Sequence, residues 1–349
     1  MKKIGISIVG GAGYGAGELL RLLSFHPEVE VVSVISSSSA GQSISSIHPQ
    51  LRGLYDFNFE KKIEISKLIK FEKAFIVTSL PHGVSAKFIY DIASDLKKNN
   101  INLIDMSGDF RLKDPALREA YYSNDERIDT LARGFVFGLP ELNRAKIRSA
   151  QFISNPGCFA LTSILALAPL AALKLNAKIA IDGKSGTSGA GRTTGEPFHH
   201  PIANSNAFAY KALTHRHEPE IAQALSEIGG SRFSISFVPH VIPCSRGIYI
   251  TAHVFLDTPV HLETMLEQYQ KFYKDSPFVR IREKAPELHW VVGSNYCDIN
   301  LCARGNILVV TAATDNLIKG MCGTAIQNIN LISGCPEELG LKIPGMGPV

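Results

Sequence analysis

The residues with the clearest chemical potential form the segment Ser154-Asn-Pro-Gly-Cys158, which precedes a strongly apolar stretch. That stretch, Phe159 to Leu173, predicts a helix, so the Cys158 thiol should lie at a helix N-terminus. The partial positive charge of a helix N-terminus favours the thiolate, the reactive form of cysteine. Pro156 and Gly157 predict a sharp turn that presents the sulfur to a cleft. Cys158 is therefore a candidate nucleophile, although a cysteine at a helix start can also simply fill a core.

The other five cysteines lie within or beside apolar strands and helices, which predicts that they behave as small hydrophobic residues. They are Cys244, Cys297, Cys302, Cys322 and Cys335. No Cys-x-x-Cys pair occurs, and Cys297 and Cys302 have no companion ligands at zinc spacing. We therefore expect no metal site and a reducing, cytoplasmic environment.

A glycine-rich turn lies between a short apolar strand, Ile4 to Val9, and a helix-like segment from Gly17 to Phe25. Its sequence is Gly10-Gly-Ala-Gly13-Tyr14-Gly-Ala16-Gly17. In a dinucleotide-binding fold, glycines at this place allow a tight turn and bring backbone N–H groups to a pyrophosphate at the helix N-terminus. The pattern fits G-x-G-x-x-A at Gly11, Gly13 and Ala16, or G-x-x-G-x-x-A at Gly10, Gly13 and Ala16, with Ala in place of the third glycine. Coenzyme contacts are expected from Gly10, Gly13, Tyr14 and Ala16. An ordinary strand-to-helix turn is the alternative.

The end of the second strand carries Ser36-Ser-Ser38-Ser39 and no carboxylate. NAD enzymes usually have an Asp or Glu there for the ribose hydroxyls, whereas NADP enzymes avoid that charge. The hydroxyl groups, with Ser36 and Ser38 as the expected contacts, therefore favour the 2′-phosphate of NADP. A serine cluster is also ordinary loop composition, and that alternative stays open.

The segment His215-Arg-His217-Glu-Pro-Glu220 begins a predicted helix directly after a long polar loop. A thiolate nucleophile and a hydride-carrying coenzyme together suit the interconversion of aldehydes and activated acyl groups through a thioester. Such a reaction needs a proton at the substrate oxygen, and histidine suits proton transfer near neutral pH. We expect the two imidazoles to point in different directions, because residues two apart do not share a helix face. His217 then lies at the helix start facing the cleft, and His215 lies in the incoming loop. A capping or surface role is the alternative for either.

Strands and helices alternate over the first half of the chain, which predicts a parallel sheet with right-handed crossovers. The expected strands are 4–9, 29–35, 75–78 and 102–105, and the expected helices are 84–96 and 140–148. From about residue 154 the pattern changes, and a mixed, largely antiparallel domain is predicted. Its strands are expected at 179–182, 233–238, 248–256, 279–282, 298–301 and 307–312. A Gly/Ser/Thr/Asn-rich stretch, 183–206, is long enough to suggest a functional loop. A last helix, 316–332, is expected to return to the first domain.

Composition favours a small-molecule enzyme over a nucleic-acid or membrane protein. The 349 residues predict about two domains, and 45% hydrophobic residues can form a sizeable core. The net charge is +4 and no block of basic residues occurs, so nucleic acid and anionic membranes are poor partners. The longest apolar run, Ile164 to Leu173, is interrupted by Pro169 and is too short to span a bilayer. The glycines from Gly10 onward interrupt any export signal. We expect a soluble protein.

Nine segments of the chain resemble the N-acetyl-gamma-glutamyl-phosphate reductase family of arginine biosynthesis, and the resemblance covers essentially the whole chain. One such segment would be weak, but nine in order are specific. They are 10–23, 80–83, 105–111, 137–144, 154–158, 185–192, 215–221, 237–243 with Arg246-Gly247, and 315–320.

The resemblance implies an α/β protein with a Rossmann dinucleotide-binding domain, residues 1–154 and 316–349. The second domain, 155–315, would be an α+β catalytic, substrate-binding and oligomerisation domain of the semialdehyde dehydrogenase type, with a mixed, largely antiparallel sheet. The implied reaction is the NADPH-dependent reduction of N-acetyl-L-glutamyl 5-phosphate to the 5-semialdehyde, with release of phosphate. The family also implies a homotetramer or dimer.

The resemblance also assigns roles to residues. Cys158 would be the nucleophile and His217 the acid/base, with His215 beside the substrate together with Asn155. Arg111 and Arg246 are candidate clamps for phosphate or carboxylate, because a guanidinium binds either anion through two donors. Each could instead form a structural ion pair. The residues expected along the nicotinamide half of the coenzyme are Ser185, Gly186, Ser188 and Gly189. Asn316 and Lys319 would close the coenzyme site from the last helix.

Two departures from the family pattern affect the coenzyme prediction. The second strand of the family commonly ends in a Ser-Arg pair, and this chain has Ser37-Ser38, so one contact to a 2′-phosphate is missing. Ala16 replaces the usual third glycine, and Gly17 follows one step later.

Three alternative functions stay open at this point. Aspartate semialdehyde dehydrogenase uses the same fold and chemistry, although the His-Arg-His-x-Pro-Glu segment favours the glutamyl enzyme. A lysine-pathway reductase acting on an aminoadipyl phosphate or a carrier-linked substrate is closer, because one methylene is worth only about 1–3 kcal/mol in a pocket. A non-catalytic NADP-binding sensor predicts loss of the thiol or the imidazole, and both are present.

Overall fold

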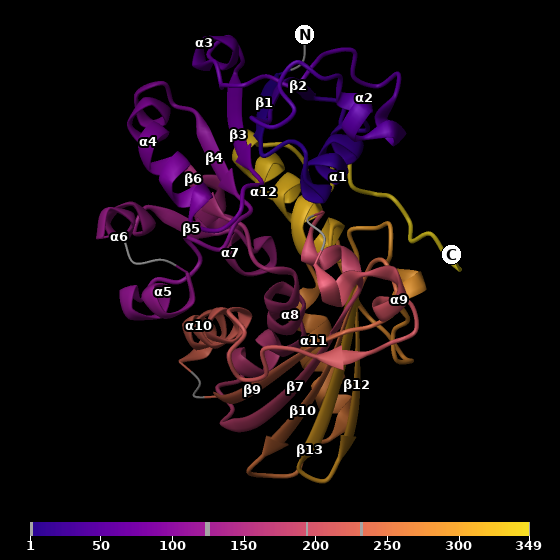
Figure 1. The fold of residues 1–349 in the computed structure, drawn as a ribbon. Coiled ribbons are helices and arrows are strands. Elements are labelled where there is room, and N and C mark those ends of the chain that lie inside the picture. The colour runs from indigo at the N-terminus through magenta and orange to yellow at the C-terminus, as the bar shows by residue number, and fades with distance from the viewer. Residues whose placement is uncertain (1–2, 123–125, 193–194, 231–232, 349) are drawn as a thin grey trace. The chain divides into compact units, whose positions relative to one another are not determined.

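The structure is a computed structural model that describes residues 3–122, 126–192, 195–230 and 233–348. The chain forms two compact units. Unit 1 comprises Met1–Pro156 and Met321–Leu341, and unit 2 comprises Gly157–Gly320 and Lys342–Val349. Each unit has its own sheet, and each is described by itself below (Figure 1).

Unit 1 contains a parallel six-stranded sheet in the order β2-β1-β3-β4-β6-β5. Its strands are β1 (Ile4–Val9), β2 (Val29–Ile35), β3 (Lys73–Thr78), β4 (Asn102–Asp105), β5 (Phe135–Phe137) and β6 (Phe152–Ser154). All six residues of β1 are buried between β2 and β3, which explains the continuous apolar run in the sequence. The chain leaves β1 for β2 on one side and returns through β3 on the other. Ligands of such sheets bind outside the carboxyl ends of the strands at this switch point.

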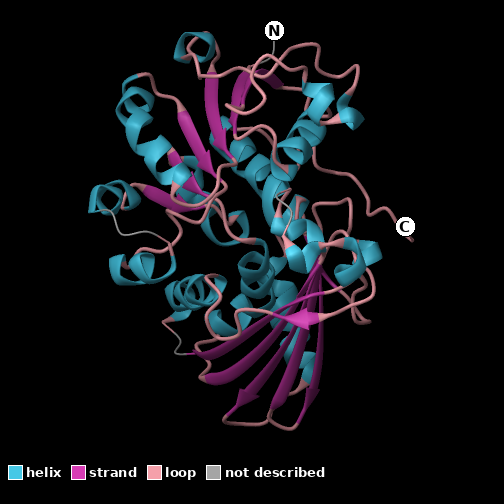
Figure 2. Cartoon of the chain, viewed as in Figure 1, coloured by secondary structure: helices cyan, strands magenta, loops and turns pink. Residues whose placement is uncertain are grey.

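Helices complete unit 1 and provide the crossovers between its parallel strands (Figure 2). They are α1 (Tyr14–Leu23), α2 (Ile44–Ile47), α3 (Ile65–Leu68), α4 (Val84–Lys98), α5 (Pro115–Tyr121), α6 (Glu126–Ala132), α7 (Pro140–Arg148) and α12 (Gly323–Ser333), with the 3-10 turn η1 (Pro49–Leu51). Although α12 comes last in the sequence, it packs on α7 within this unit. The predicted return of the final helix is therefore confirmed.

Unit 2 contains a mixed seven-stranded sheet in the order β11-β12-β13-β10-β7-β9-β8. Its strands are β7 (Ala177–Ser185), β8 (Phe208–Ala209), β9 (Phe233–Val241), β10 (Ile248–Leu256), β11 (Val279–Ile281), β12 (Cys297–Arg304) and β13 (Ile307–Thr314). The pairs β7–β10, β10–β13, β12–β13 and β8–β9 are antiparallel, while β7–β9 and β11–β12 are parallel. Buried and more accessible residues alternate along β10, as in a sheet with one covered face.

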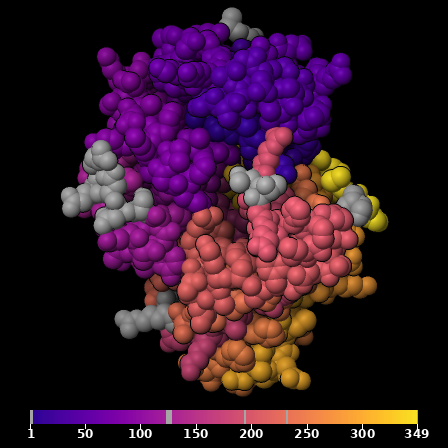
Figure 3. Space-filling model, viewed as in Figure 1, coloured from indigo at the N-terminus to yellow at the C-terminus, as the bar shows by residue number. Residues whose placement is uncertain are grey.

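Helices α8 (Cys158–Ala172), α10 (His217–Gly229) and α11 (Leu262–Tyr273) pack against this sheet. Almost every residue of α8 is buried, because it lies between α10, α11 and four of the strands. The predicted functional loop contains the short helices η2 (Thr187–Ala190), η3 (Glu196–Phe198) and α9 (His200–Ala203), apart from residues 193–194, which lie outside the described residues. This segment is largely at the surface, where Figure 3 shows it in pink.

The α/β fold class is confirmed, and most predicted elements are present with bounds that differ by a few residues. The last helix is a correction: it is not continuous from Asn316, because a π-helical turn, η5 (Ile318–Cys322), precedes α12. A further 3-10 turn, η4 (Leu288–Trp290), lies in unit 2.

The predicted domain boundary is also wrong at the C-terminus. Residues 316–320 and 342–349, expected in the Rossmann domain, belong to unit 2. The physical reason is backbone pairing: Met346 N–H donates to the Val292 carbonyl at 2.9 Å, and Gly347 N–H donates to His289 at 3.2 Å.

Within the described residues, no helix is both long enough and apolar enough to cross a bilayer. The same residues contain no cluster of metal-ligating side chains. All six cysteines are free thiols. Of the five predicted to behave as small hydrophobic residues, Cys297 and Cys322 are buried, Cys244 and Cys335 are partly buried, and Cys302 is exposed, which does not fit the prediction.

Candidate active site and coenzyme-binding turn

The predicted nucleophile begins α8. Cys158 is its first residue, and Gly157, the N-cap, has an extended backbone (φ −73°, ψ 149°) that turns the chain sharply into the helix. The Cys158 side chain is partly accessible. Gly320 makes room for it, because a Cβ on Gly320 would lie 2.7 Å from the Cys158 Cβ. The thiol therefore lies where the positive end of the helix favours its ionised form.

The two histidines lie at the start of α10. His217 is the first helical residue, and His215 precedes the helix. Both rings contact the Phe159 ring edge-on, with centroid distances of 5.9 Å for His215 and 6.1 Å for His217. Their own ring centroids are 4.6 Å apart. The expectation that they point in different directions is wrong, because His215 belongs to a non-helical turn whose side chain folds back onto α10. Since Phe159 follows Cys158, α10 brings both imidazoles to the start of α8.

His215 is a neutral imidazole. The backbone N–H of His217 donates to its Nδ1 at 3.2 Å, which requires that Nδ1 carry no proton. Burial is the main reason why the pKa of His215 is lowered to about 3, and the neighbouring charges of Arg216 and Lys211 contribute to the same shift. A histidine that stays neutral across the physiological range cannot act as the titrating acid/base near pH 7, and this favours His217 for that role.

Two residues at this site were not predicted from the sequence. Glu220 is fully buried, and its Oε1 accepts a hydrogen bond from the Gly157 backbone N–H at 2.8 Å. The Tyr210 ring lies edge-on to His215 at 5.5 Å. Burial and the nearby Cys158 thiol both raise the pKa of Tyr210, so its phenol stays protonated. A glutamate in the first turn of a helix is common because its negative charge interacts favourably with the helix dipole. The sequence therefore gives no indication of the contact between Glu220 and Gly157.

The residues predicted along the nicotinamide form a rigid loop cluster in unit 2. Backbone N–H groups of Gly186, Thr187 and Ser188 donate to carbonyls of Gly247, Cys244 and Ser245 at 2.9–3.0 Å. Asn316 joins the two loops, because its Oδ1 accepts from Gly247 N–H at 2.8 Å and its Nδ2 donates to Ser188 Oγ at 2.9 Å. A Cβ on Gly189 would lie 2.9 Å from Ser185 Oγ. The structure thus brings Ser185, Gly186, Ser188, Gly189 and Asn316 together.

Arg246 and Lys319 border this cluster. Arg246 donates to the buried Asp315 through Nε (3.0 Å) and Nη2 (3.1 Å), so one edge of its guanidinium makes a structural ion pair. The Arg246 side chain is 25% exposed. Lys319 is fully buried with its Nζ 6.0 Å from the centroid of the Phe278 ring.

In unit 1, the glycine turn connects β1 to α1 at the switch point of the sheet. Gly10 has φ +85°, which glycine adopts without strain, and a Cβ there would meet the Ser79 carbonyl at 2.4 Å. A Cβ on Gly11 would lie 2.2 Å from Val34. Gly13 differs, because the nearest atom to a Cβ there is its own turn's Gly10 carbonyl at 3.7 Å. The surface of the turn at Gly13 is thus open, as a backbone cradle for a pyrophosphate requires.

The displaced third glycine has a structural explanation. His48 is buried behind the turn, and its Nε2–H donates to the Gly11 carbonyl at 2.7 Å. A Cβ on Gly17 would lie 2.6 Å from His48 Nδ1, whereas Ala16 is accommodated in the core. Gly17 therefore makes room for the histidine that fixes the turn. His48 lies 31 residues from Gly17, so no local pattern indicates this contact.

We expect Gly17→Ala to weaken coenzyme binding by about tenfold, because overpacking of this size costs roughly 1–3 kcal/mol and displaces His48 from Gly11. Fluorescence titration with NADPH measures the dissociation constant. The double variant Gly17→Ala/His48→Ala is the matched control: it removes the clash, so the additional cost of Gly17→Ala should largely disappear. An unchanged dissociation constant in Gly17→Ala would contradict this explanation.

The serine turn after β2 lies at the same end of the sheet. Ser36 is buried, and its Oγ lies 3.4 Å from Ser38 Oγ. The structure brings the Glu60 backbone to this turn, because Ser36 N–H donates to the Glu60 backbone carbonyl at 3.0 Å. The Glu60 side chain is paired with Lys67, whose Nζ donates to both carboxylate oxygens at 2.9 Å. Tyr14, the first residue of α1, is exposed.

The two remaining residues predicted to bind substrate, Arg111 and Asn155, form hydrogen bonds within unit 1. Arg111 is buried, and it donates through Nε to the Asn155 carbonyl (2.7 Å) and through Nη2 to the Met106 carbonyl (3.1 Å). Asn155 is fully buried; its Nδ2 donates to the Met321 carbonyl, and its Oδ1 accepts from Asn328. These contacts give both residues a structural role, and ligand binding by either stays a prediction.

Comparison with known proteins agrees with this arrangement. The semialdehyde dehydrogenase NAD-binding domain matches residues 5–150, and the semialdehyde dehydrogenase dimerisation domain matches residues 158–316. The chain is 42% identical to an N-acetyl-gamma-glutamyl-phosphate reductase of Methanococcus maripaludis, covering 98% of this chain and 99% of the relative. It is 40% identical to the reductase of the same name from Methanocaldococcus jannaschii, with the same coverage. The chain belongs to the N-acetyl-gamma-glutamyl-phosphate reductase family.

The solved structures with the same fold are less similar in sequence to this chain than the two reductases are. Aspartate semialdehyde dehydrogenase II of Vibrio cholerae aligns with a TM-score of 0.69 at 15% identity, covering 96% of this chain and 99% of that one. The aspartate semialdehyde dehydrogenase of Candida albicans, solved with NADP, gives a TM-score of 0.66 at 13% identity, covering 94% and 97%. At these identities the likeness establishes the fold alone.

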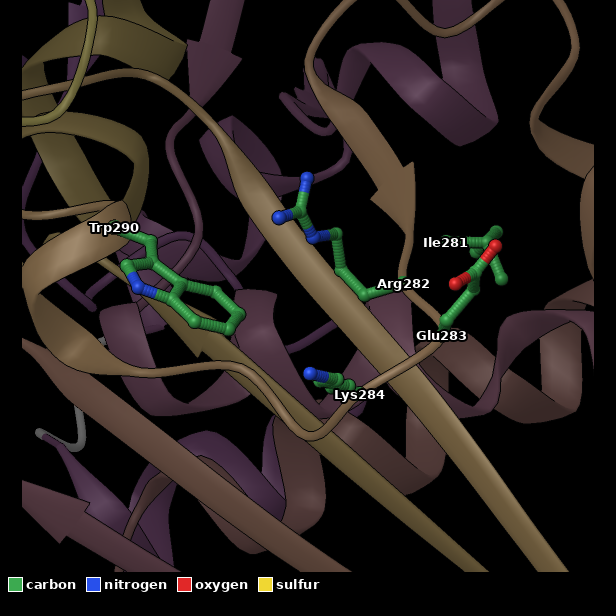
Figure 4. Close-up of a pocket in the computed structure, with 5 residues that line it drawn as sticks. All are labelled: Ile281, Arg282, Glu283, Lys284 and Trp290. Atoms are coloured by element: carbon green, nitrogen blue, oxygen red, sulfur yellow. The ribbon is translucent and has the colours of Figure 1, made fainter.

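A hollow of about 330 Å³ in this reductase-family chain contains none of the predicted site residues (Figure 4). Its lining consists of Ile281, Arg282, Glu283, Lys284 and Trp290. The charge of Arg282 is partly neutralised, because its Nε lies 3.7 Å from the buried Asp298, and its guanidinium also lies 5.2 Å from the centroid of the Trp290 ring. We therefore do not include it in the candidate active site.

Proposed function

We propose that this chain catalyses the NADPH-dependent reduction of N-acetyl-L-glutamyl 5-phosphate to N-acetyl-L-glutamate 5-semialdehyde and phosphate. The observation that carries the proposal is the pairing of α8 and α10, which brings the His217 imidazole to the helix start that presents the Cys158 thiol. The family membership supports the acyl phosphate substrate. The glycine turn of unit 1 supports the coenzyme.

The chemistry begins at sulfur. The Cys158 thiolate attacks the acyl carbon of the acyl phosphate, a C–S bond forms, and the tetrahedral oxyanion is stabilised by the N–H groups at the start of α8. The C–O bond to the phosphate then breaks, and phosphate leaves. The product of this step is a thioester on Cys158, which retains the energy of the acyl phosphate for the reduction.

The coenzyme would be held by the open face of the glycine turn, with Gly10, Gly13, Tyr14 and Ala16 at the pyrophosphate. When bound, NADPH supplies the hydride that reduces the acyl group. His217 holds the proton that the substrate oxygen needs as the thioester is reduced. The His217 imidazole takes that proton back as the C–S bond breaks, so that the semialdehyde leaves and the Cys158 thiolate is restored.

Substrate binding needs positive charge for the phosphate and the carboxylate. Arg246 is our first candidate, because one edge of its guanidinium is fixed by Asp315 and the side chain stays partly exposed. Arg111 is the second candidate, and His215 and Asn155 are further candidates for substrate contacts. His215, held neutral, would contribute a hydrogen bond rather than a charge.

We expect NADPH to be preferred over NADH, because the turn after β2 carries hydroxyl groups and the nearby Glu60 is neutralised by Lys67. Steady-state kcat/KM values with each coenzyme measure the preference. Ser38→Glu should lower kcat/KM for NADPH by about tenfold through repulsion of the 2′-phosphate and leave the value for NADH nearly unchanged. Equal or better kcat/KM with NADH in the unmodified chain would refute NADP preference and leave the reductase assignment intact.

The substrate proposal is tested by the phosphate-dependent reverse reaction. The chain should form NADPH from N-acetylglutamate semialdehyde only when inorganic phosphate is present. The aminoadipate semialdehyde analogue and aspartate semialdehyde serve as comparisons. A kcat/KM at least as high with either comparison compound would transfer the chain to the lysine-pathway or aspartate reaction.

We also propose a cytoplasmic homodimer or homotetramer that binds neither nucleic acid nor membranes. The support for assembly is the family name of unit 2, a dimerisation domain, and the uncovered face of its sheet, where Phe255 on β10 is 44% exposed. Light scattering in solution tests this directly, and a monomer at micromolar concentration would refute it.

A further inference from the structure

Helices α8 and α10 pack against each other, and three contacts fix how they align. At one end, Glu220 on α10 accepts a hydrogen bond from Gly157 N–H at 2.8 Å. Next to it, the Phe159 ring of α8 lies against His215 and His217. At the other end, the backbones approach so closely that a Cβ on Gly229 would lie 1.9 Å from the Ala171 carbonyl.

The contact at Glu220 has a direct consequence for chemistry. Gly157 is the residue before Cys158, and Glu220 lies three positions after His217, on the same side of α10. The hydrogen bond therefore connects the backbone that presents the nucleophile to the helix turn that presents the acid/base. A change in the length of this hydrogen bond would change the distance between the Cys158 sulfur and the His217 imidazole. Small displacements of reacting groups lower the reaction rate strongly.

We propose that Glu220 is a positioning residue that sets the alignment of Cys158 and His217 through its hydrogen bond to Gly157. The catalytic effect of Glu220 rests on the proposed function, because it requires that Cys158 and His217 act in that reaction. Its geometry stands on the Glu220–Gly157 contact itself. The carboxylate is completely buried, and removing one partner of a buried, charge-assisted hydrogen bond is more disruptive than replacing a surface carboxylate.

The negative charge of the Glu220 carboxylate has an effect that can be separated from its hydrogen bond by comparing two substitutions. A negative charge beside the start of α8 opposes ionisation of the thiol, while the helix N-terminus favours it. The other titratable groups near the thiol are Tyr210, His215 and His217. Glu220→Gln retains an oxygen acceptor for Gly157 N–H and removes the charge. Glu220→Ala removes both.

The experiment compares these two variants by kcat, KM and the pH profile of Cys158 alkylation by iodoacetamide. Glu218→Ala is the matched control, because Glu218 lies on the same helical turn and accepts from a backbone N–H at 3.0 Å, but that N–H belongs to Phe237. We expect Glu220→Ala to lower kcat at least 100-fold with KM changed less than threefold. Glu220→Gln should retain kcat within about tenfold and shift the alkylation profile to lower pH. Glu218→Ala should leave both readouts near the wild-type values.

Two results would overturn the proposal. One is Glu220→Ala with wild-type kcat and alkylation profile, which would show that the hydrogen bond does not position the thiol. The other is an equal loss of kcat in Glu220→Gln and Glu220→Ala, which would assign the effect to charge instead of the hydrogen bond. The alkylation profile needs neither substrate nor coenzyme, so a shift in Glu220→Gln would still support the contact if the proposed reaction failed.

Discussion

Replacing Cys158 by serine should abolish turnover, with a decrease in kcat on the order of 10⁵-fold or more, as expected when a covalent nucleophile is removed. Serine keeps nearly the same volume, so the fold of unit 2 should be preserved. Coenzyme binding should also be preserved, because the glycine turn belongs to unit 1. Steady-state assays measure the loss of turnover, and NADPH titration measures binding in the same preparation.

The matched control is Cys302→Ser, because Cys302 is exposed on β12, where its Sγ donates to Asn300 Oδ1 at 3.7 Å. Its turnover should equal that of the wild type. Near-normal activity in Cys158→Ser would show that the nucleophile is misassigned. Complete loss in Cys244→Ser alone would do the same, although burial raises the pKa of the Cys244 thiol and makes it a poor nucleophile.

The second large effect concerns the two histidines. His217→Asn should lower kcat by 10²- to 10⁴-fold with little change in KM, which is roughly 3–5 kcal/mol of transition-state stabilisation. His215→Asn should mainly weaken substrate binding or stability, because His215 is neutral and its Nδ1 accepts the His217 backbone N–H. Profiles of kcat against pH for both variants check the assignment.

The pH profiles carry the distinguishing information. The pKa of folded His215 is about 3, so its removal cannot delete an ionisation near neutral pH. His215→Asn should therefore keep the shape of the wild-type profile at reduced amplitude, and His217→Asn should lose one limb. A lost ionisation in His215→Asn, with the wild-type profile and rate in His217→Asn, would transfer the acid/base role to His215.

Local patterns identified the parts of the site that are local in sequence. The strand β1, the glycine turn and the helix start at Cys158 follow from a buried apolar run, clustered glycines and a Pro-Gly turn, and each has the predicted place. These features depend on neighbouring residues, so short windows of sequence contain the necessary information.

Contacts between distant residues were beyond such patterns. Glu220 lies 63 residues from Gly157, and His48 lies 37 residues from Gly11. Nothing in the composition of either segment indicates the partner, because both contacts use a backbone group that every residue type offers. The relative direction of His215 and His217 was mispredicted for a related reason: a helical rule was applied to a residue that precedes the helix.

The most direct test of covalent catalysis is to mix the chain with N-acetyl-L-glutamyl 5-phosphate in the absence of coenzyme, quench with acid, and determine its mass. The account predicts release of one phosphate per active site and one N-acetylglutamyl group attached through a thioester to Cys158, located by peptide mapping. Addition of NADPH before the quench should remove the adduct and yield the semialdehyde. Stoichiometric reduction with no adduct at Cys158, or an adduct on another residue that NADPH converts to product, would contradict the account.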